Sequence, residues 1–219
     1  MIAKKIIDLK KSLPSDVQLI AVSKTKPIAL IEDALNSGHL DFGENKVQEL
    51  VEKREKMSKD IRWHMIGHLQ RNKVKYIASF IHLIHGVDSE RLMNEINKQG
   101  KINNRKIPCL LQFHIAQEST KFGFSIEELK SIISENKHLK WENIVLKGVM
   151  GMATFTENKT QVEQEFKQLK SYFDEIKKLI HKPDEFNIIS MGMSNDYDIA
   201  IKNGSNMIRV GSSLFGARH

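Results

Sequence analysis

Lys24 is the side chain with the clearest potential for chemistry, because it closely follows a short apolar run at residues 19–22 and precedes Pro27. A run of this kind is typical of a buried strand, which would place the lysine at the carboxyl end of that strand. An amine there is either a solvated strand end or a nucleophile that forms Schiff bases. Its position alone favours the solvated interpretation, and the rest of the chain reverses that preference.

Two segments near the end of the chain have the residue types that hold phosphate groups. Residues 190–196 (SMGMSND) and 211–216 (GSSLFG) each follow a short apolar run. Gly211 lets the backbone approach a ligand, Ser212 can open a helical turn, and the free N–H groups of that turn, with the Ser194 hydroxyl, form a phosphate cup. Either segment alone fits ordinary loop and cap chemistry. Together with Lys24, they predict a phosphorylated ligand bonded to a lysine.

Short apolar runs alternate with helical patterns along the whole chain. We expect strands at residues 19–23, 40–43, 61–66, 80–87, 107–115, 144–150, 186–189 and 207–210. We expect helices at residues 28–36, 46–56, 72–78, 89–98, 159–179, 194–202 and 212–215, and one capped by Ser125 with Glu128 completing a capping box.

About eight strand–helix units in a row indicate a parallel sheet. The 219 residues suit one (β/α)8 barrel of the TIM type, since such barrels run to about 200–250 residues. We therefore predict an α/β fold with a single domain over residues 1–219. A doubly wound open sheet is the alternative, but it normally has a glycine-rich dinucleotide turn, which residues 23–26 (SKTK) do not resemble. In a barrel, ligands bind at the carboxyl ends of the strands, with phosphate after strands seven and eight.

The composition is that of an ordinary globular protein, with 40% hydrophobic and 28% charged residues. The net charge of +7 is spread along the chain, and its densest clusters, near residues 53–56 and 177–178, fit solvated helix faces. Aromatic residues do not interleave with basic ones, so no nucleic-acid partner is expected. No apolar stretch reaches the roughly 20 residues of a membrane span, and the start lacks a signal peptide. We predict a cytoplasmic protein with no membrane partner.

The remaining reactive side chains fit structural roles. Cys109 lies in an apolar run and is expected to be a buried, inert thiol. Four histidines are close in sequence but fall on different predicted strands and loops, and no cysteine or carboxylate completes a metal set with His64, His68, His82 and His85. We therefore expect no metal site.

Five short segments carry a resemblance to a known family. They are residues 21–27 (AVSKTKP), 42–45 (FGEN), 63–73 (WHMIGHLQRNK), 190–194 (SMGMS) and 209–218 (RVGSSLFGAR). The chain resembles the pyridoxal phosphate homeostasis protein family, a single-domain relative of the alanine racemase barrel. The resemblance covers nearly the whole chain, and the segments are highly specific together although each alone would be weak.

The resemblance implies that pyridoxal 5′-phosphate (PLP) forms an internal aldimine with Lys24. It implies a place beside the cofactor for Asn45, a place facing the pyridine nitrogen for Arg209, and phosphate contacts from Ser194, Gly211 and Ser212.

Two further lysines, Lys26 and Lys121, match family lysines near the mouth of the site. The departures from the family pattern are His68, within residues 66–69, and Ser212, where threonine is common. Neither departure removes a donor that the site needs. In an extended strand, Lys26 would point to the same side as Lys24, and a nearby cation favours a neutral, nucleophilic amine.

Arg209 limits the chemistry that such a site supports. A guanidinium stays protonated and only donates, so it leaves the pyridine nitrogen unprotonated and weakens the ring as an electron sink. The site therefore suits racemisation or simple holding of the cofactor.

We predict a PLP-binding protein that buffers or delivers the cofactor and has no catalytic residue, with PLP-dependent apo-enzymes as candidate partners. The family's enzymatic relatives add a β domain and a catalytic tyrosine from a partner subunit. This chain ends after the eighth unit, and Tyr76, Tyr172 and Tyr197 fall in predicted helices, so no proton-transfer base opposite Lys24 is evident. The missing domain also predicts a monomer. The alternative is a weak amino-acid racemase that uses Lys24 as one base.

Overall fold

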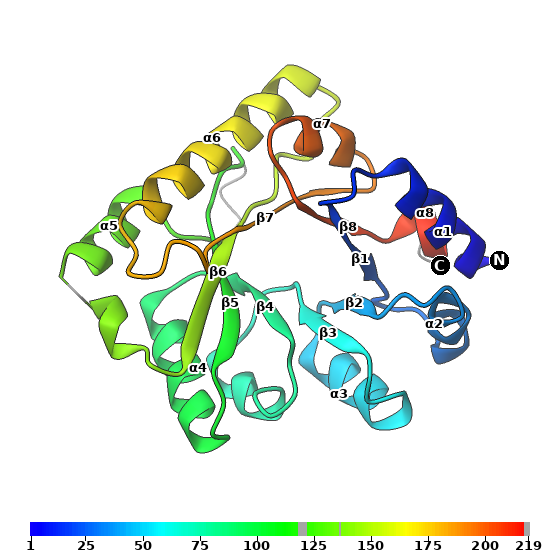
Figure 1. The fold of residues 1–219 in the computed structure, drawn as a ribbon, viewed down its shortest axis with the longest axis horizontal. Helices are drawn as coiled ribbons and strands as arrows, with labels where there is room; N and C mark the ends of the chain where they lie inside the picture. The colour runs from blue at the N-terminus through cyan, green and yellow to red at the C-terminus, as the bar shows by residue number, and fades with distance from the viewer. Residues whose placement is uncertain (118–121, 136, 217–219) are drawn as a thin grey trace.

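Eight parallel strands form a closed barrel in which each strand pairs with the next along the chain and the last pairs with the first (Figure 1). The computed structural model describes residues 1–117, 122–135 and 137–216. The strands are β1 Gln18–Val22, β2 Asp41–Glu44, β3 Arg62–Met65, β4 Leu83–Val87, β5 Ile107–Gln112, β6 Ile144–Met150, β7 Ile188–Met193 and β8 Met207–Val210. The predicted (β/α)8 barrel is confirmed.

Helices surround the barrel and cover the outer faces of its strands (Figure 1). The α-helices are α1 Ile2–Ser12, α2 Ile28–Leu35, α3 Val47–Lys56, α4 Glu90–Ile102, α5 Ile126–Ser134, α6 Lys159–Lys177, α7 Tyr197–Lys202 and α8 Ser212–Phe215, and two 3-10 helices are η1 Arg71–Tyr76 and η2 Lys137–Lys140. The expected helix at residues 72–78 is thus a 3-10 helix. The capping of α5 is as predicted, because the Ser125 hydroxyl accepts from the Glu128 N–H at 3.1 Å.

Three differences from the sequence expectations concern α1, β7 and α7. Helix α1 was not expected; its buried Ile2 and Ile6 lie one turn apart, and the helix packs against α2 and α8. Strand β7 continues to Met193, four residues beyond the expected end, so Ser190 lies within the barrel wall rather than in a loop. Helix α7 begins after Asp196 rather than at Ser194 or Asn195.

The apolar core has an inner part and an outer part. Side chains from five strands meet inside the barrel, where they form a cluster of Ile20, Leu83, Leu110, Met150 and Met207. A larger cluster fills the layer between the strands and the helices. Cys109 belongs to this outer layer, and burial raises the pKa of its thiol, as expected for an inert cysteine.

No helix within residues 1–117, 122–135 and 137–216 combines the length and the low charge that a membrane crossing requires.

The close approach of β6 and β7 at Gly148 leaves no room for a side chain. The φ of Gly148 is +152°, and a Cβ atom there would overlap the carbonyl oxygen of its strand partner Ile188. We expect Gly148→Ala to lower the free energy of unfolding by about 3 kcal/mol or more, because relief requires the two strands to separate. The control is Gly38→Ala, where φ is +74° with no atom within 4 Å; it should lose only about 1–2 kcal/mol. Equal losses in urea denaturation would contradict this explanation.

Candidate functional site

A cavity of about 1070 Å³ opens at the carboxyl ends of the strands. Its wall is formed by residues at or just beyond the ends of six strands, β1, β2, β3, β6, β7 and β8, with Gln112 contributed by the end of β5. All six predicted site residues line this cavity: Lys24, Asn45, Ser194, Arg209, Gly211 and Ser212. Lys26 lines it as well, whereas Lys121 lies outside the residues that the structure describes.

Lys24 is held in a tight turn rather than in a strand. The turn begins at Ser23, and the N–H of Lys26 donates to the Ser23 carbonyl oxygen at 3.0 Å. Thr25, within the turn, has a φ of +65°, a left-handed conformation that is uncommon for a β-branched residue. The expectation that strand alternation aligns Lys24 with Lys26 is therefore wrong. The turn, instead, brings both lysines to the cavity.

A buried polar cluster lies beneath this turn. The ammonium group of Lys53, in α3, donates to the Ser23 carbonyl oxygen at 2.8 Å, to Glu44 Oε1 at 2.8 Å and to Glu49 Oε1 at 2.7 Å. The Ser23 hydroxyl also donates to Glu44 Oε1 at 2.6 Å, and the Thr25 N–H donates to Glu49 Oε1 at 2.6 Å. Burial raises the pKa of Glu44, and the neighbouring Lys53 partly offsets that effect.

Lys53 corrects the expectation that residues 53–56 form a solvated helix face, since only 5% of Lys53 is exposed. The sequence does contain a signal for its burial. Val47, Leu50 and Lys53 follow one another at intervals of three and share the buried face of α3. A lysine on the apolar face of a helix is expected to have an acidic partner, which Glu44 and Glu49 provide.

The segments after β7 and β8 lie side by side at the cavity. The N–H of Gly211 donates to Ser194 Oγ at 3.3 Å, so the hydroxyl hydrogen of Ser194 remains available as a donor. Helix α8 begins at Ser212, and the N–H of Leu214 makes a helical hydrogen bond to Gly211 at 3.0 Å. The N–H groups of Ser212 and Ser213 precede that bond, as at any helix start.

Arg209 is a fixed cation in the cavity wall. Its Nη1 donates to the carbonyl oxygen of Ser190 at 2.8 Å and to Ser190 Oγ at 2.6 Å, and its Nη2 donates to the Gly151 carbonyl oxygen at 3.1 Å. Burial lowers the pKa of Arg209 to about 10, partly offset by the charge of Asp196. The guanidinium therefore stays protonated at neutral pH.

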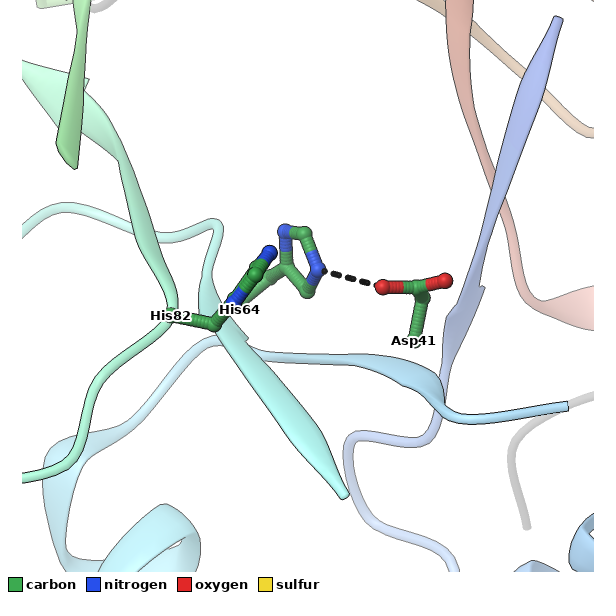
Figure 2. A group of neighbouring side chains, drawn as sticks. All are labelled: Asp41, His64 and His82. Carbon is green, nitrogen blue, oxygen red and sulfur yellow. Dashed lines mark hydrogen bonds and ion pairs between the residues drawn. The ribbon is translucent and has the colours of Figure 1, made fainter. Parts of the chain in front are cut away.

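The expectation that no carboxylate lies with the histidines is wrong, because Asp41 joins two of them. Asp41, His64 and His82 have potential ligand atoms within 4.8 Å of one another (Figure 2). Asp41 begins β2 and His82 precedes β4, so the group lies at the amino end of the barrel, opposite the cavity. Arg62 donates to both oxygens of Asp41, at 2.7 and 2.6 Å. The carboxylate is thus engaged in an ion pair, and the absence of a metal site stays a prediction.

Electrostatics in this group favour neutral histidines beside a charged carboxylate. Burial alone would raise the pKa of Asp41, but hydrogen bonds from Arg62 and His64 outweigh it and hold that pKa below the usual range. Burial lowers the pKa of His64, and it lowers the pKa of His82 to about 4.

Comparisons with known proteins cover the whole chain. The family described as alanine racemase, N-terminal domain, matches residues 1–219. The pyridoxal phosphate homeostasis protein of Haemophilus influenzae is 35% identical over 206 residues, which cover 93% of this chain and 86% of that protein. The protein of the same name from Aquifex aeolicus is 36% identical, with coverage of 92% and 87%.

Solved structures agree with the fold. PipY of Synechococcus elongatus, determined without PLP, superposes with a TM-score of 0.91 at 30% identity and covers 99% of this chain and 100% of its own. PipY with PLP bound superposes with a TM-score of 0.88, also at 30% identity and with the same coverage. Alanine racemase of Clostridium difficile has a TM-score of 0.77 at 18% identity, over 99% of this chain and 56% of its own, and shares the fold alone. The chain belongs to the pyridoxal phosphate homeostasis protein family, and its barrel is that of the alanine racemase N-terminal domain.

Proposed function

We propose that this protein binds PLP in the cavity, holds it covalently on Lys24, and serves PLP homeostasis by buffering or delivering the cofactor. The observation that carries the proposal is that Lys24, Arg209 and the paired segments after β7 and β8 all line one cavity. An amine, a guanidinium and a set of hydroxyl and N–H donors suit the aldehyde, the pyridine nitrogen and the phosphate of PLP. The homologous PipY has been determined with PLP bound, which supports the same ligand here.

Each group has a separate task in this proposal. The Nζ of Lys24 adds to the aldehyde carbon, and the aldehyde oxygen leaves as water, so that an aldimine C=N bond remains. Ser194, Gly211 and Ser212 bind the phosphate through hydroxyl and N–H donors. Arg209 donates to the pyridine nitrogen, and Asn45 lies beside the ring.

The proposed role is non-catalytic, which the placement of the tyrosines supports. Tyr76 is half-exposed at the end of η1, Tyr172 packs against the ring of Phe113, and Tyr197 opens α7. In the described part of the chain, none of the three lines the cavity. Racemases of this fold need a second base opposite the lysine, and none of these tyrosines is placed to act as one.

Two further features belong to the same proposal. We place the protein in the cytoplasm, where a free thiol such as that of Cys109 stays reduced. PLP-dependent apo-enzymes are the proposed recipients of the cofactor, and the monomeric state stays a prediction.

Titration with PLP tests the covalent attachment. We expect the wild-type protein to develop the visible absorbance of an imine, and Lys24→Ala to lose it, because the variant lacks the amine proposed to form that bond. Lys26→Ala is the matched control, since Lys26 lines the same cavity and donates to the Gly216 carbonyl oxygen at 3.0 Å. Loss of the imine absorbance in Lys26→Ala with retention in Lys24→Ala would overturn the assignment.

Ser194→Ala tests the phosphate contact. Removing a hydroxyl donor to a charged phosphate should raise the Kd for PLP roughly tenfold. Pyridoxal lacks the phosphate, so its Kd should not change in the same variant. An equal loss for both ligands in fluorescence titrations would mean that Ser194 acts on the cavity as a whole.

Hydrogen exchange tests the non-catalytic role against the racemase alternative. In D2O, the PLP-loaded protein should exchange the α-hydrogen of alanine no faster than free PLP does, because no second base is in place. Faster exchange that disappears in Lys24→Ala would establish the racemase instead. NMR of the recovered alanine measures the exchange.

A further inference from the structure

A continuous line of buried hydrogen bonds crosses the interior of the barrel, from Arg209 beside the cavity to Asp41 at the opposite end. Ser190 Oγ lies 2.6 Å from Arg209 Nη1 and 3.1 Å from His85 Nδ1. His85 Nε2 lies 3.0 Å from His64 Nδ1, and His64 Nε2 lies 3.2 Å from Asp41 Oδ1. His64, His85 and Ser190 are fully buried, and at most 5% of Asp41 or Arg209 is exposed.

The line joins two groups of strands that are distant in sequence: β2, β3 and β4 on one side, and β7 and β8 on the other. Its far end reaches the surface through Arg62, whose side chain is 45% exposed and forms an ion pair with Asp41. Figure 2 shows the far end, where the ring of His64 bonds to Asp41 with His82 beside it. His64 and His85 occupy interior positions where apolar side chains would otherwise pack. A buried imidazole requires hydrogen-bond partners for both of its nitrogens, and the line provides them for both rings.

The hydrogen positions along the line follow from its charged end. An ionised carboxylate only accepts, so Asp41 requires a proton on His64 Nε2. A neutral His64 then accepts at Nδ1, which requires a proton on His85 Nε2. A neutral His85 in turn accepts at Nδ1, so the Ser190 hydroxyl donates to it and presents its lone pairs to Arg209. Burial lowers the pKa of both histidines, which keeps them neutral at neutral pH.

We propose that Asp41 orients Arg209 through this line, and that Ser190, His85 and His64 are positioning residues for the contact between Arg209 and the cofactor's pyridine nitrogen. The placement of that nitrogen rests on the proposed function. The line of hydrogen bonds itself is independent of that ligand. Arg209 is a buried cation whose hydrogen bonds, within the described residues, run to the neutral oxygens of Ser190 and Gly151, while Asp196 acts on it through its charge. The line fixes Ser190 Oγ as an acceptor for Arg209, and it connects the guanidinium to the carboxylate of Asp41 at the far end of the barrel.

The first test uses the ligand-free protein and therefore does not depend on PLP binding. Long-range proton–nitrogen NMR of protein with labelled histidine reports which ring nitrogen carries the proton. The chain has nine histidines, and the signals of His64 and His85 are assigned by their loss in His64→Asn and His85→Asn. We expect both His64 and His85 to be neutral and protonated at Nε2 at pH 7. A proton on Nδ1 of either ring, or a charged ring, would overturn the proposal.

Two variants at the amino end separate the role of Asp41 from that of its ion pair. Asp41→Ala removes the acceptor that sets the direction, so His64 and His85 should each show a mixture of both neutral forms. Arg62→Gln removes the ion pair but keeps the carboxylate, so both rings should remain protonated at Nε2. Unchanged rings in Asp41→Ala, in a protein with a native circular dichroism spectrum, would contradict control by Asp41.

The second test measures the effect at the cavity. Ser190→Ala breaks the junction between His85 and Arg209, and it should weaken PLP binding roughly three- to tenfold, the loss of one hydrogen bond at a charged group. A PLP analogue with carbon in place of the pyridine nitrogen has no acceptor for Arg209, so its binding should not change. A purely structural role for Ser190 would weaken both ligands equally. If wild-type protein fails to bind PLP at all, the proposed function fails, while the NMR result still decides the direction of the line.

Discussion

The ammonium group of Lys53 is buried directly beneath the turn that carries Lys24, where it joins α3 to the ends of β1 and β2. A buried charge is tolerated only with partners, and removing one partner of such a group typically costs about 3–5 kcal/mol. Glu44, Glu49 and the Ser23 carbonyl oxygen satisfy all three ammonium hydrogens. Because Glu49 also accepts from the Thr25 N–H, the same carboxylate holds the strained residue next to Lys24. The position of the turn that carries Lys24 thus depends on a charge network outside the cavity.

The two ends of the barrel differ in chemistry but are connected. At the carboxyl end, lysine, arginine, serine and glycine line the cavity. At the amino end, Asp41 pairs with Arg62. The apolar cluster of Ile20, Leu83, Leu110, Met150 and Met207 fills part of the interior. Arg209 lies between them as a buried cation that contacts Ser190. The hydrogen-bond partners of the buried cations Lys53 and Arg209 are thus groups that do not line the cavity.

Local patterns in the sequence predict the barrel and four members of the cavity, Lys24, Ser194, Gly211 and Ser212, whereas Asn45 and Arg209 are assigned from the family resemblance. Apolar runs that alternate with amphipathic helices indicate the strands, and parallel strands bring their carboxyl ends, with Lys24 and Ser194, to one edge. Asp41 and Lys53 could not be interpreted in the same way. Asp41 lies in an apolar strand pattern, and its partners Arg62 and His64 are more than 20 residues away. Lys53 belongs to a basic cluster. Its spacing from Val47 and Leu50 marks the buried face of α3, but only the tertiary structure shows that Glu44 is its partner.

Borohydride reduction of the PLP-loaded protein, followed by peptide mass mapping, tests most directly whether the Lys24 turn is the attachment point. Reduction converts a C=N bond into a stable amine, so the adduct remains on the lysine that formed it. We expect a single reduced pyridoxyl-phosphate adduct on the peptide that contains Lys24, at Lys24 and not at Lys26. An adduct at another lysine, or a protein that takes up no PLP and yields no adduct, would contradict it.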